Sequence, residues 1–415
     1  MIVIGLLLIA AATLIPYALS PSAQQTVVAD AAFVPTKNVE GLRAAARATG
    51  DPIFDVATWY ALRNEMPETH GVLIESLDGR RVFASHNADE TFNPASLIKL
   101  ATSLVALNKF SAAYRFQTRV FMQGAVDRAG TLEGALYISG DDPTFGDYGA
   151  SLISRELRAR GIKRISEGIN VSSNFCFNFS DSPEESAARL TRVLRLKNTP
   201  SGVADANDGK LLFTIKSNSL PDILLYMNAH SSNFIAERIG AILGGPASIE
   251  QFLTERLHLP TAQVTVSRAS GRERNRLTPR GLLTIIRALN DETNRQHLQL
   301  SDVMPIASDD AGTLRRRLSG TGLERAVVAK TGTLTREVDG GMASLAGIVY
   351  TTDNEPIVFA ILDQGTSIWN NRQMEDQLLA EVVNGYATPR PIASPTPRHL
   401  LPSANLQIEE SKQSE

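Results

Sequence analysis

A serine and a lysine three residues apart, Ser96 and Lys99, are the side chains in this sequence with the clearest chemical potential. At the start of a helix, this spacing places both on one face, one turn apart. A serine hydroxyl becomes a strong nucleophile only when a neighbouring base takes its proton, and an amine with a lowered pKa can be that base. The pair therefore predicts nucleophilic catalysis by Ser96 with Lys99 as its base.

The residues around this pair predict a helix that begins just before it. Asn93 can serve as the N-cap, and Pro94 suits the first helical position. Ser96 would then lie in the first turn, where free backbone N–H groups favour developing negative charge. An apolar stripe continues at helical spacing, formed by Leu97, Leu100, Ala101, Leu104 and Val105. Because such a pair also arises by chance, its meaning depends on the other motifs of the chain.

Two further motifs follow. Ser231-Ser232-Asn233 precedes an amphipathic segment, so that a hydroxyl and an amide could point into a site from a helix start. Lys330-Thr331-Gly332-Thr333 ends a β-branched strand, where Lys330 can present positive charge to a substrate carboxylate. Gly332 would let a ligand backbone approach, and the Thr333 N–H could donate to an oxyanion beside that of Ser96. Taken alone, Ser231-Ser232-Asn233 is a weak signal. Lys330-Thr331-Gly332-Thr333 is equally explained as an exposed turn at a strand end.

The three motifs occur in the order Ser-x-x-Lys, Ser-x-Asn and Lys-Thr-Gly, the first two at helix starts and the third on a strand. This ordered set resembles the signature of the penicillin-binding protein and serine β-lactamase superfamily. Further segments are similar to the class C low-molecular-mass penicillin-binding proteins, the DacB-like peptidases of the S13 family. These segments are Asn93–Ser96, Tyr114–Val120, Leu136–Thr144, Asn275–Arg280 and Gly312–Leu318. The resemblance covers about residues 55 to 385.

The resemblance implies a serine-type D-Ala-D-Ala carboxypeptidase acting on peptidoglycan peptides, with DD-endopeptidase activity as an open addition. By it, Ser96 is the acylated nucleophile, Lys99 its base, and Ser231 part of the proton relay. Asn233 and Lys330-Thr331-Gly332-Thr333 would bind substrate, with Thr333 lining the oxyanion hole. β-Lactams would acylate Ser96 as covalent inhibitors, and no metal or organic cofactor is implied. Two alternatives stay open: a β-lactamase or esterase-type serine hydrolase, and a non-catalytic cell-wall binding protein.

The resemblance also implies the β-lactamase/transpeptidase-like fold. This is an α+β architecture, an α/β/α sandwich whose antiparallel sheet is flanked by helices, with an inserted smaller α/β domain. We expect the catalytic domain over residues 55–115 and 213–385 and the inserted domain over residues 116–212. Strands near 70–77, 81–84, 326–329, 343–350 and 356–362 would supply the sheet. Residues 23–54 are interpreted as a linker and an N-terminal helix, and residues 386–415 are predicted to be disordered.

The composition fits a globular protein. Charged residues make up 20% of the chain and the formal net charge is −3, without a basic run that would suggest nucleic acid. Six scattered histidines and one cysteine, Cys176, give no metal-ligand spacing. The apolar stretch over residues 2–19 indicates a signal peptide or membrane anchor within residues 1–22. We therefore expect the protein in the periplasm or on the outer face of the cytoplasmic membrane. Where this segment is retained, it would associate the protein with the membrane.

Three segments depart from the family pattern. The insert between Ser96 and Ser231 is shorter than is typical of this group. Arg268-Ala269-Ser270-Gly271-Arg272 stands where an Asp/Asn-Gly-Ser-Gly-Leu stretch is common, and Arg336–Gly341 follows the third motif as an insertion. The last two bear on substrate preference, but they remove none of the expected catalytic groups.

Overall fold

The computed structural model describes residues 53–196, 199–205, 208–365, 367–392 and 405–410. The expected signal peptide or anchor and most of the expected linker and N-terminal helix lie outside these residues. Within the described part of the chain, no helix is both long enough and apolar enough to cross a bilayer.

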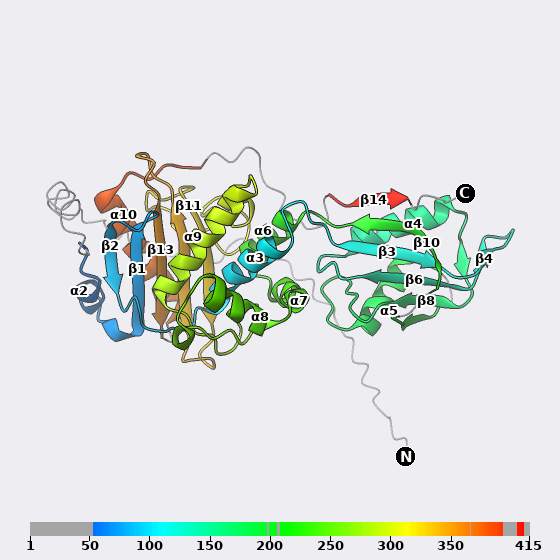
Figure 1. Ribbon diagram of the computed structural model, residues 1–415, viewed down its shortest axis with the longest axis horizontal. Coiled ribbons are helices and arrows are strands. Elements are labelled where there is room, and N and C mark those ends of the chain that lie inside the picture. Colours follow the sequence, from blue (N-terminus) through cyan, green and yellow to red (C-terminus); the bar gives the residue numbers. More distant parts are fainter. Residues whose placement is uncertain (1–52, 197–198, 206–207, 366, 393–404, 411–415) are drawn as a thin grey trace, which may run out of the picture. The chain divides into compact units, whose positions relative to one another are not determined.

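A five-stranded antiparallel sheet is the centre of the unit that carries the three motifs, with strand order β11-β12-β13-β1-β2 (Figure 1). Its strands are β1 (His70–Ser76), β2 (Val82–His86), β11 (Val327–Leu334), β12 (Met342–Val349) and β13 (Ile357–Gln364). Every residue of β1 and β12 is buried, which is typical of strands that are covered on both faces. The sheet leaves β11, with the Lys-Thr-Gly motif, at one edge.

Helices cover both faces of this sheet. One apolar cluster joins α2 and α10 to the first face, and a second joins α3 and α9 to the other. The helices of this unit are α2 (Val56–Ala61), α3 (Ile98–Lys109), α6 (Leu220–His230), α7 (Asn233–Leu243), α8 (Pro246–Gln251), α9 (Pro279–Arg295) and α10 (Ile368–Tyr386). Four 3-10 turns, η1 (Pro67–Thr69), η2 (Ala95–Leu97), η4 (Thr261–Gln263) and η5 (Leu300–Asp302), and one π turn, η3 (Phe252–Arg256), complete it. The expected antiparallel sheet flanked by helices is confirmed.

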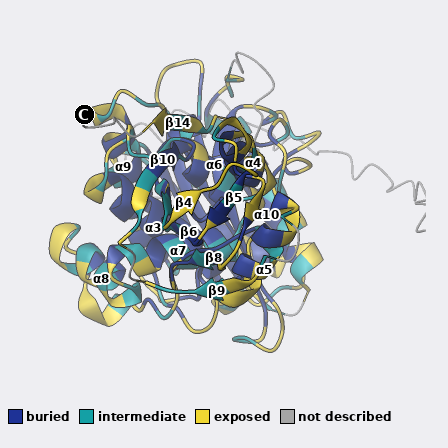
Figure 2. Ribbon diagram, turned by 90° about the vertical axis from the view of Figure 1, so that its right-hand side faces the viewer, coloured by how far each residue is buried: buried dark blue, intermediate teal, exposed yellow. Residues whose placement is uncertain are grey.

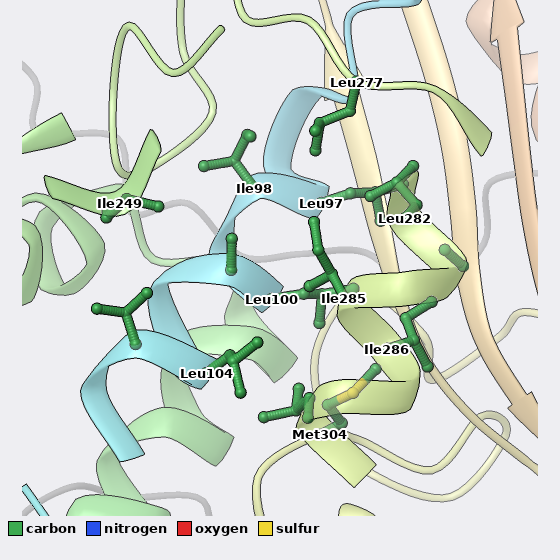
Figure 3. Packing of buried hydrophobic residues seen from close by; sticks show 14 of the residues in the cluster. Leu97, Ile98, Leu100, Leu104, Ile249, Leu277, Leu282, Ile285, Ile286 and Met304 are labelled. Atoms are coloured by element: carbon green, nitrogen blue, oxygen red, sulfur yellow. The ribbon is translucent and has the colours of Figure 1, made fainter. Parts of the chain in front are cut away.

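The apolar stripe that follows Ser96 anchors α3 in this core. Leu97 and Leu100 point toward side chains of α9, among them Leu282 and Ile285, and Leu104 points toward Met304 (Figure 3). Leu97 and Leu100 are fully buried, so replacing either with alanine would cost about 2–5 kcal/mol of folding free energy. The stripe therefore fixes the helix start on which Ser96 and Lys99 stand.

A second sheet, of six strands, is built from the residues between the first and second motifs, in the order β14-β10-β3-β6-β8-β9. Its unit contains β3 (Gln117–Met122), β4 (Ala125–Val126), β5 (Thr131–Glu133), β6 (Ala135–Gly140), α4 (Asp147–Ala159), β7 (Arg164–Ile165), β8 (Gly168–Val171), α5 (Pro183–Leu194), β9 (Ser201–Val203) and β10 (Lys210–Lys216). This unit has its own apolar core, while β4 is exposed (Figure 2). The expected boundary at residue 212 falls inside β10, which continues to Lys216.

The C-terminal segment departs from the prediction of a disordered tail. Residues 405–410 are described, and Gln407–Glu410 form β14, which pairs antiparallel with β10. Leu406 and Ile408 pack against the apolar core of the second sheet. The short alternation of apolar and polar residues there gives a half-buried edge strand, a signal that the high Pro and Ser content before it obscures.

Candidate active site

Ser96 lies where the turn η2 passes into α3. The chain enters this helix through a 3-10 turn at Ala95–Leu97, whereas the sequence predicted an α-helix starting at Pro94. Pro94, and not the expected Asn93, occupies the N-cap position of this turn, while Asn93 Oδ1 accepts a hydrogen bond from the Ala95 N–H at 3.1 Å just before it. Ala95 has a φ of 52°, a left-handed conformation that costs a non-glycine residue roughly 1–2 kcal/mol. The turn that carries Ser96 is therefore strained and must be held by its neighbours.

Lys99 is fully buried, and its amine touches three oxygen atoms. Lys99 Nζ lies 2.9 Å from Ser96 Oγ, 2.8 Å from Asn233 Oδ1 and 2.5 Å from the carbonyl oxygen of Ser270. The amide oxygen and the carbonyl can only accept hydrogen bonds, whereas the hydroxyl can also donate. A neutral amine has two N–H groups and one lone pair. It can donate to both acceptors and accept a hydrogen bond from the Ser96 hydroxyl.

Burial is the main cause that lowers the pKa of Lys99, to about 7. The positive charge of Arg272 acts in the same direction, and the carboxylate of Glu237 opposes both. Glu237 also accepts a hydrogen bond from the backbone N–H of Ser270. Close to neutral pH, a substantial fraction of Lys99 is therefore the free amine that can act as a base.

Ser231 and Lys330 form a second contact in the same unit. Ser231 caps the C-terminus of α6 with a φ of 53°, and Ser232 caps α7, which begins at Asn233. Ser231 therefore sits between two helices, although the sequence predicted it at a helix start. Lys330 Nζ donates to Ser231 Oγ at 3.0 Å and to the Thr331 carbonyl at 2.6 Å. Lys330 is fully buried, and burial together with the charge of Lys99 lowers its pKa well below the usual value.

Thr331 and Thr333 present their side chains on the opposite face of β11 from Lys330, because side chains alternate along a strand. Thr331 Oγ1 donates to Thr313 Oγ1 at 2.8 Å, and Arg372 Nη2 donates to Thr333 Oγ1 at 2.6 Å. The Ala329 N–H donates away from β12, to Pro305. Because N–H directions also alternate, the Thr333 N–H points to the outer edge of the sheet, away from β12.

Two glycines allow β11 and the altered Arg268–Arg272 segment to close on the Ser96 turn. A Cβ at Gly332 would lie 2.1 Å from Ser344 Oγ and 2.8 Å from the Pro94 carbonyl oxygen. The chain itself fills the space into which a side chain at Gly332 would project, and the approach of a ligand backbone to this strand stays a prediction. A Cβ at Gly271 would lie 1.9 Å from the Ala95 carbonyl oxygen, and its φ is +82°. The backbone around Ser270 therefore contributes to the site although its side chains depart from the family pattern.

The insertion after the third motif packs beside the loop that precedes Ser96. Asp339 accepts hydrogen bonds from Asn93 Nδ2 at 2.6 Å and from Arg276 at 2.8 Å. The Arg276 guanidinium holds the pKa of Asp339 below its usual value. Asn93 also donates to the Glu273 carbonyl. The insertion thus supports the entry to the nucleophile turn.

Sequence reasoning missed three contributors to this site. The Ser270 carbonyl is a backbone group, so the residue type does not reveal it. The segment Arg268–Arg272 was noted only because it stands where the family has a characteristic stretch. Thr313 lies within Gly312–Leu318, a segment noted only for its resemblance. Arg372 lies on α10, outside every motif, and nothing local in the sequence distinguishes it from other surface arginines. The expected residues Ser96, Lys99 and Asn233 share direct contacts, and so do Ser231, Lys330 and Thr331.

Solved structures of peptidoglycan enzymes share this fold. The predatory endopeptidase Bd3459 of Bdellovibrio bacteriovorus, in complex with its immunity protein, matches with a TM-score of 0.67 and 21% identity, covering 80% of this chain and 96% of that chain. Its penicillin G-acylated form matches with a TM-score of 0.66 and 22% identity, with coverages of 80% and 96%. Penicillin-binding protein 4 (dacB) of Haemophilus influenzae matches with a TM-score of 0.60 and 18% identity, covering 74% of this chain and 96% of that chain.

Sequence comparison adds the family. No curated protein sequence matches the chain. The pattern of one family, described as D-Ala-D-Ala carboxypeptidase 3 (S13), matches residues 53–182 and 189–383. These ranges take in all three motifs, the second sheet apart from β14, and the segment that contains Arg372. The chain belongs to the D-Ala-D-Ala carboxypeptidase 3 (S13) family.

Proposed function

We propose that this protein is a serine-type D-Ala-D-Ala carboxypeptidase that hydrolyses peptidoglycan peptides through an acyl-enzyme on Ser96. One observation carries the proposal: Lys99 Nζ lies 2.9 Å from Ser96 Oγ, and its other two contacts are pure acceptors. The pKa of this amine, lowered to about 7 by burial, suits a general base near neutral pH. Membership of the S13 family gives the reaction class, and the geometry supports the proposal that Ser96 is the nucleophile and Lys99 its base.

In the proposed reaction, Ser96 Oγ attacks the carbonyl carbon of the peptide bond before the terminal D-Ala while Lys99 takes the hydroxyl proton. The backbone N–H groups of Ser96 and Thr333 stabilise the resulting oxyanion. Collapse of the tetrahedral intermediate breaks the C–N bond, and the leaving amine receives a proton through Ser231, which Lys330 orients. Water then hydrolyses the ester and regenerates the Ser96 hydroxyl. Asn233 and Thr331 contribute to substrate binding.

The same chemistry would cleave a cross-link in which the leaving amine belongs to a D-amino acid. The structural relative described as a predatory endopeptidase supports this second activity, because the two chains share their fold over most of that protein. Penicillin binding is proposed on similar grounds, since a relative of the same fold has been solved in its penicillin G-acylated form. Peptidoglycan lies outside the cytoplasmic membrane, so we place the enzyme there. A signal peptide or anchor over residues 1–22 stays a prediction.

Release of D-Ala from a peptide ending in D-Ala-D-Ala tests this function. The wild-type protein should release D-Ala, and the Ser96→Ala variant should not. Ser172→Ala is a matched control, because Ser172-Ser173-Asn174-Phe175 repeats the sequence around Ser231 within the second sheet unit. That control should keep the wild-type rate. No release by wild type, or equal release by Ser96→Ala, would refute the assignment, and rapid turnover of penicillin would favour a β-lactamase instead.

A further inference from the structure

The substrate of a carboxypeptidase ends in a carboxylate, and the lysine of the third motif is poorly placed to bind it. Lys330 is fully buried, and its amine already donates to Ser231 Oγ and to the Thr331 carbonyl. Burial and the charge of Lys99 lower the pKa of Lys330 well below its usual value, which weakens it as a fixed cation. Another group must therefore supply the positive charge at the carboxylate subsite.

Arg372 is placed to supply that charge. It lies in the second turn of α10, and its Nη2 donates to Thr333 Oγ1 at 2.6 Å. Thr333 is half-buried, so a ligand can reach its hydroxyl, and its N–H points to the outer edge of β11, away from β12. A guanidinium stays protonated at any pH at which the enzyme works, and its planar fork suits a carboxylate.

Neighbouring residues hold Arg372 in this place without neutralising it. The Arg372 carbonyl accepts a hydrogen bond from Arg317, and Arg317 is itself clamped by Glu375 and Asp376. Among the residues that the structure describes, no carboxylate forms an ion pair with Arg372, whose one side-chain partner there is the neutral hydroxyl of Thr333. The backbone of Arg372 is therefore fixed, while its charge is available to a ligand.

We propose that Arg372 is the substrate-binding cation that recognises the α-carboxylate of the terminal D-amino acid, together with the Thr333 hydroxyl. Lys330 then orients Ser231 rather than anchoring the substrate. This inference rests on the proposed function and deepens it, because it assigns the carboxylate subsite of the same site. It predicts a strong preference for substrates with a free terminal carboxylate, whether from a D-Ala-D-Ala end or from a D-amino acid at a cross-link.

Paired substrates test this assignment. One is an acyl-D-Ala-D-Ala peptide, and the other is the same peptide ending in a carboxamide, which lacks the negative charge. For Arg372→Gln, kcat/KM on the carboxylate substrate should fall by about 10- to 100-fold, the range expected for one charge-assisted hydrogen bond. The carboxamide should react at nearly the wild-type rate, so the preference between the two substrates should collapse. Arg372→Lys should recover part of it.

The control is Arg63→Gln, which removes an arginine that contacts α10 through Glu381 but lies outside the proposed site. It should keep the wild-type preference, and thermal unfolding checks that all variants fold. An unchanged preference in Arg372→Gln, with an active wild type, would overturn the carboxylate assignment and leave the proposed function intact. A wild-type enzyme inactive on both peptides would instead refute the function and this inference with it.

Discussion

The contacts of one amine, Lys99 Nζ, account for most of the chemistry proposed at the residue scale. Lys99 Nζ can take the Ser96 proton only as the neutral amine, and burial favours that form. A neutral amine that donates its two N–H groups to Asn233 Oδ1 and the Ser270 carbonyl would keep its lone pair for the Ser96 hydroxyl. A second proposed role also depends on charge: Arg372 recognises the substrate carboxylate.

The pH dependence of acylation follows from the pKa of Lys99. Because burial lowers this pKa to about 7, the amine is protonated and inactive below that pH and free above it. The second-order rate constant for acylation by penicillin G should fall about tenfold for each pH unit below 7 and level off above it. Stopped-flow measurements across this range check the profile. A rate that does not change with pH would show that Lys99 is not the base.

At the element scale, two glycines decide whether the nucleophile turn can form. Gly332 of β11 and Gly271 of the altered segment both approach the Pro94–Ser96 backbone more closely than any side chain would allow. Both pack against the turn in which Ala95 adopts its left-handed conformation. The edge strand, the altered segment and the start of α3 therefore act as one rigid support for Ser96.

The substitution Gly271→Ala should disable the site. The added Cβ would lie 1.9 Å from the Ala95 carbonyl oxygen at a φ of +82°, so the turn carrying Ser96 must move. A displacement of this order typically costs about 100-fold in rate. Penicillin acylation of the purified variant measures the loss.

The matched control for this substitution is Gly245→Ala. Gly245 also has a positive φ, of +87°, but a Cβ there would meet no atom within 4 Å. This variant should lose about 1–3 kcal/mol of stability, because its backbone conformation suits glycine, but it should keep its acylation rate. Equal rates for the two alanine variants would contradict the role given to Gly271.

At the scale of the whole molecule, the chain builds two separate sheets, and its C-terminal segment belongs to the second. β14 pairs with β10, and Lys216 and Arg160 form ion pairs with Glu409 and Glu410. None of these residues contributes to the site around Ser96. The C-terminal strand therefore protects an edge of the second sheet and has no part in the proposed chemistry.

Removal of residues 405–415 tests whether β14 stabilises the second sheet without affecting the site around Ser96. Without β14, the outer edge of β10 loses its pairing partner, so the β10 amides should exchange with solvent faster. The rate of Ser96 acylation should be unchanged. Hydrogen exchange followed by mass spectrometry measures the first effect, and penicillin labelling measures the second. Loss of labelling together with the strand would show that the C-terminal segment supports the catalytic unit.

The sequence allowed much of this architecture to be predicted, because the three motifs combine distinctive residues with helix and strand signals. Ser96 and Lys99 lie in contact, as their spacing at a helix start predicts, whereas the contact of Ser231 with Lys330 was not predicted. Three features could not be foreseen. The Ser270 carbonyl is a backbone group, Arg372 reaches Thr333 only through the packing of α10, and β14 depends on pairing with a strand far away in sequence.

Covalent labelling of Ser96 is the most direct test of the central claim. The intact protein, incubated with penicillin G and analysed by mass spectrometry, should gain the mass of one penicilloyl group. Peptide mapping should place that group on Ser96, and Ser96→Ala should gain nothing. An adduct on a different residue, an adduct retained by Ser96→Ala, or no adduct on the wild-type protein would contradict the account.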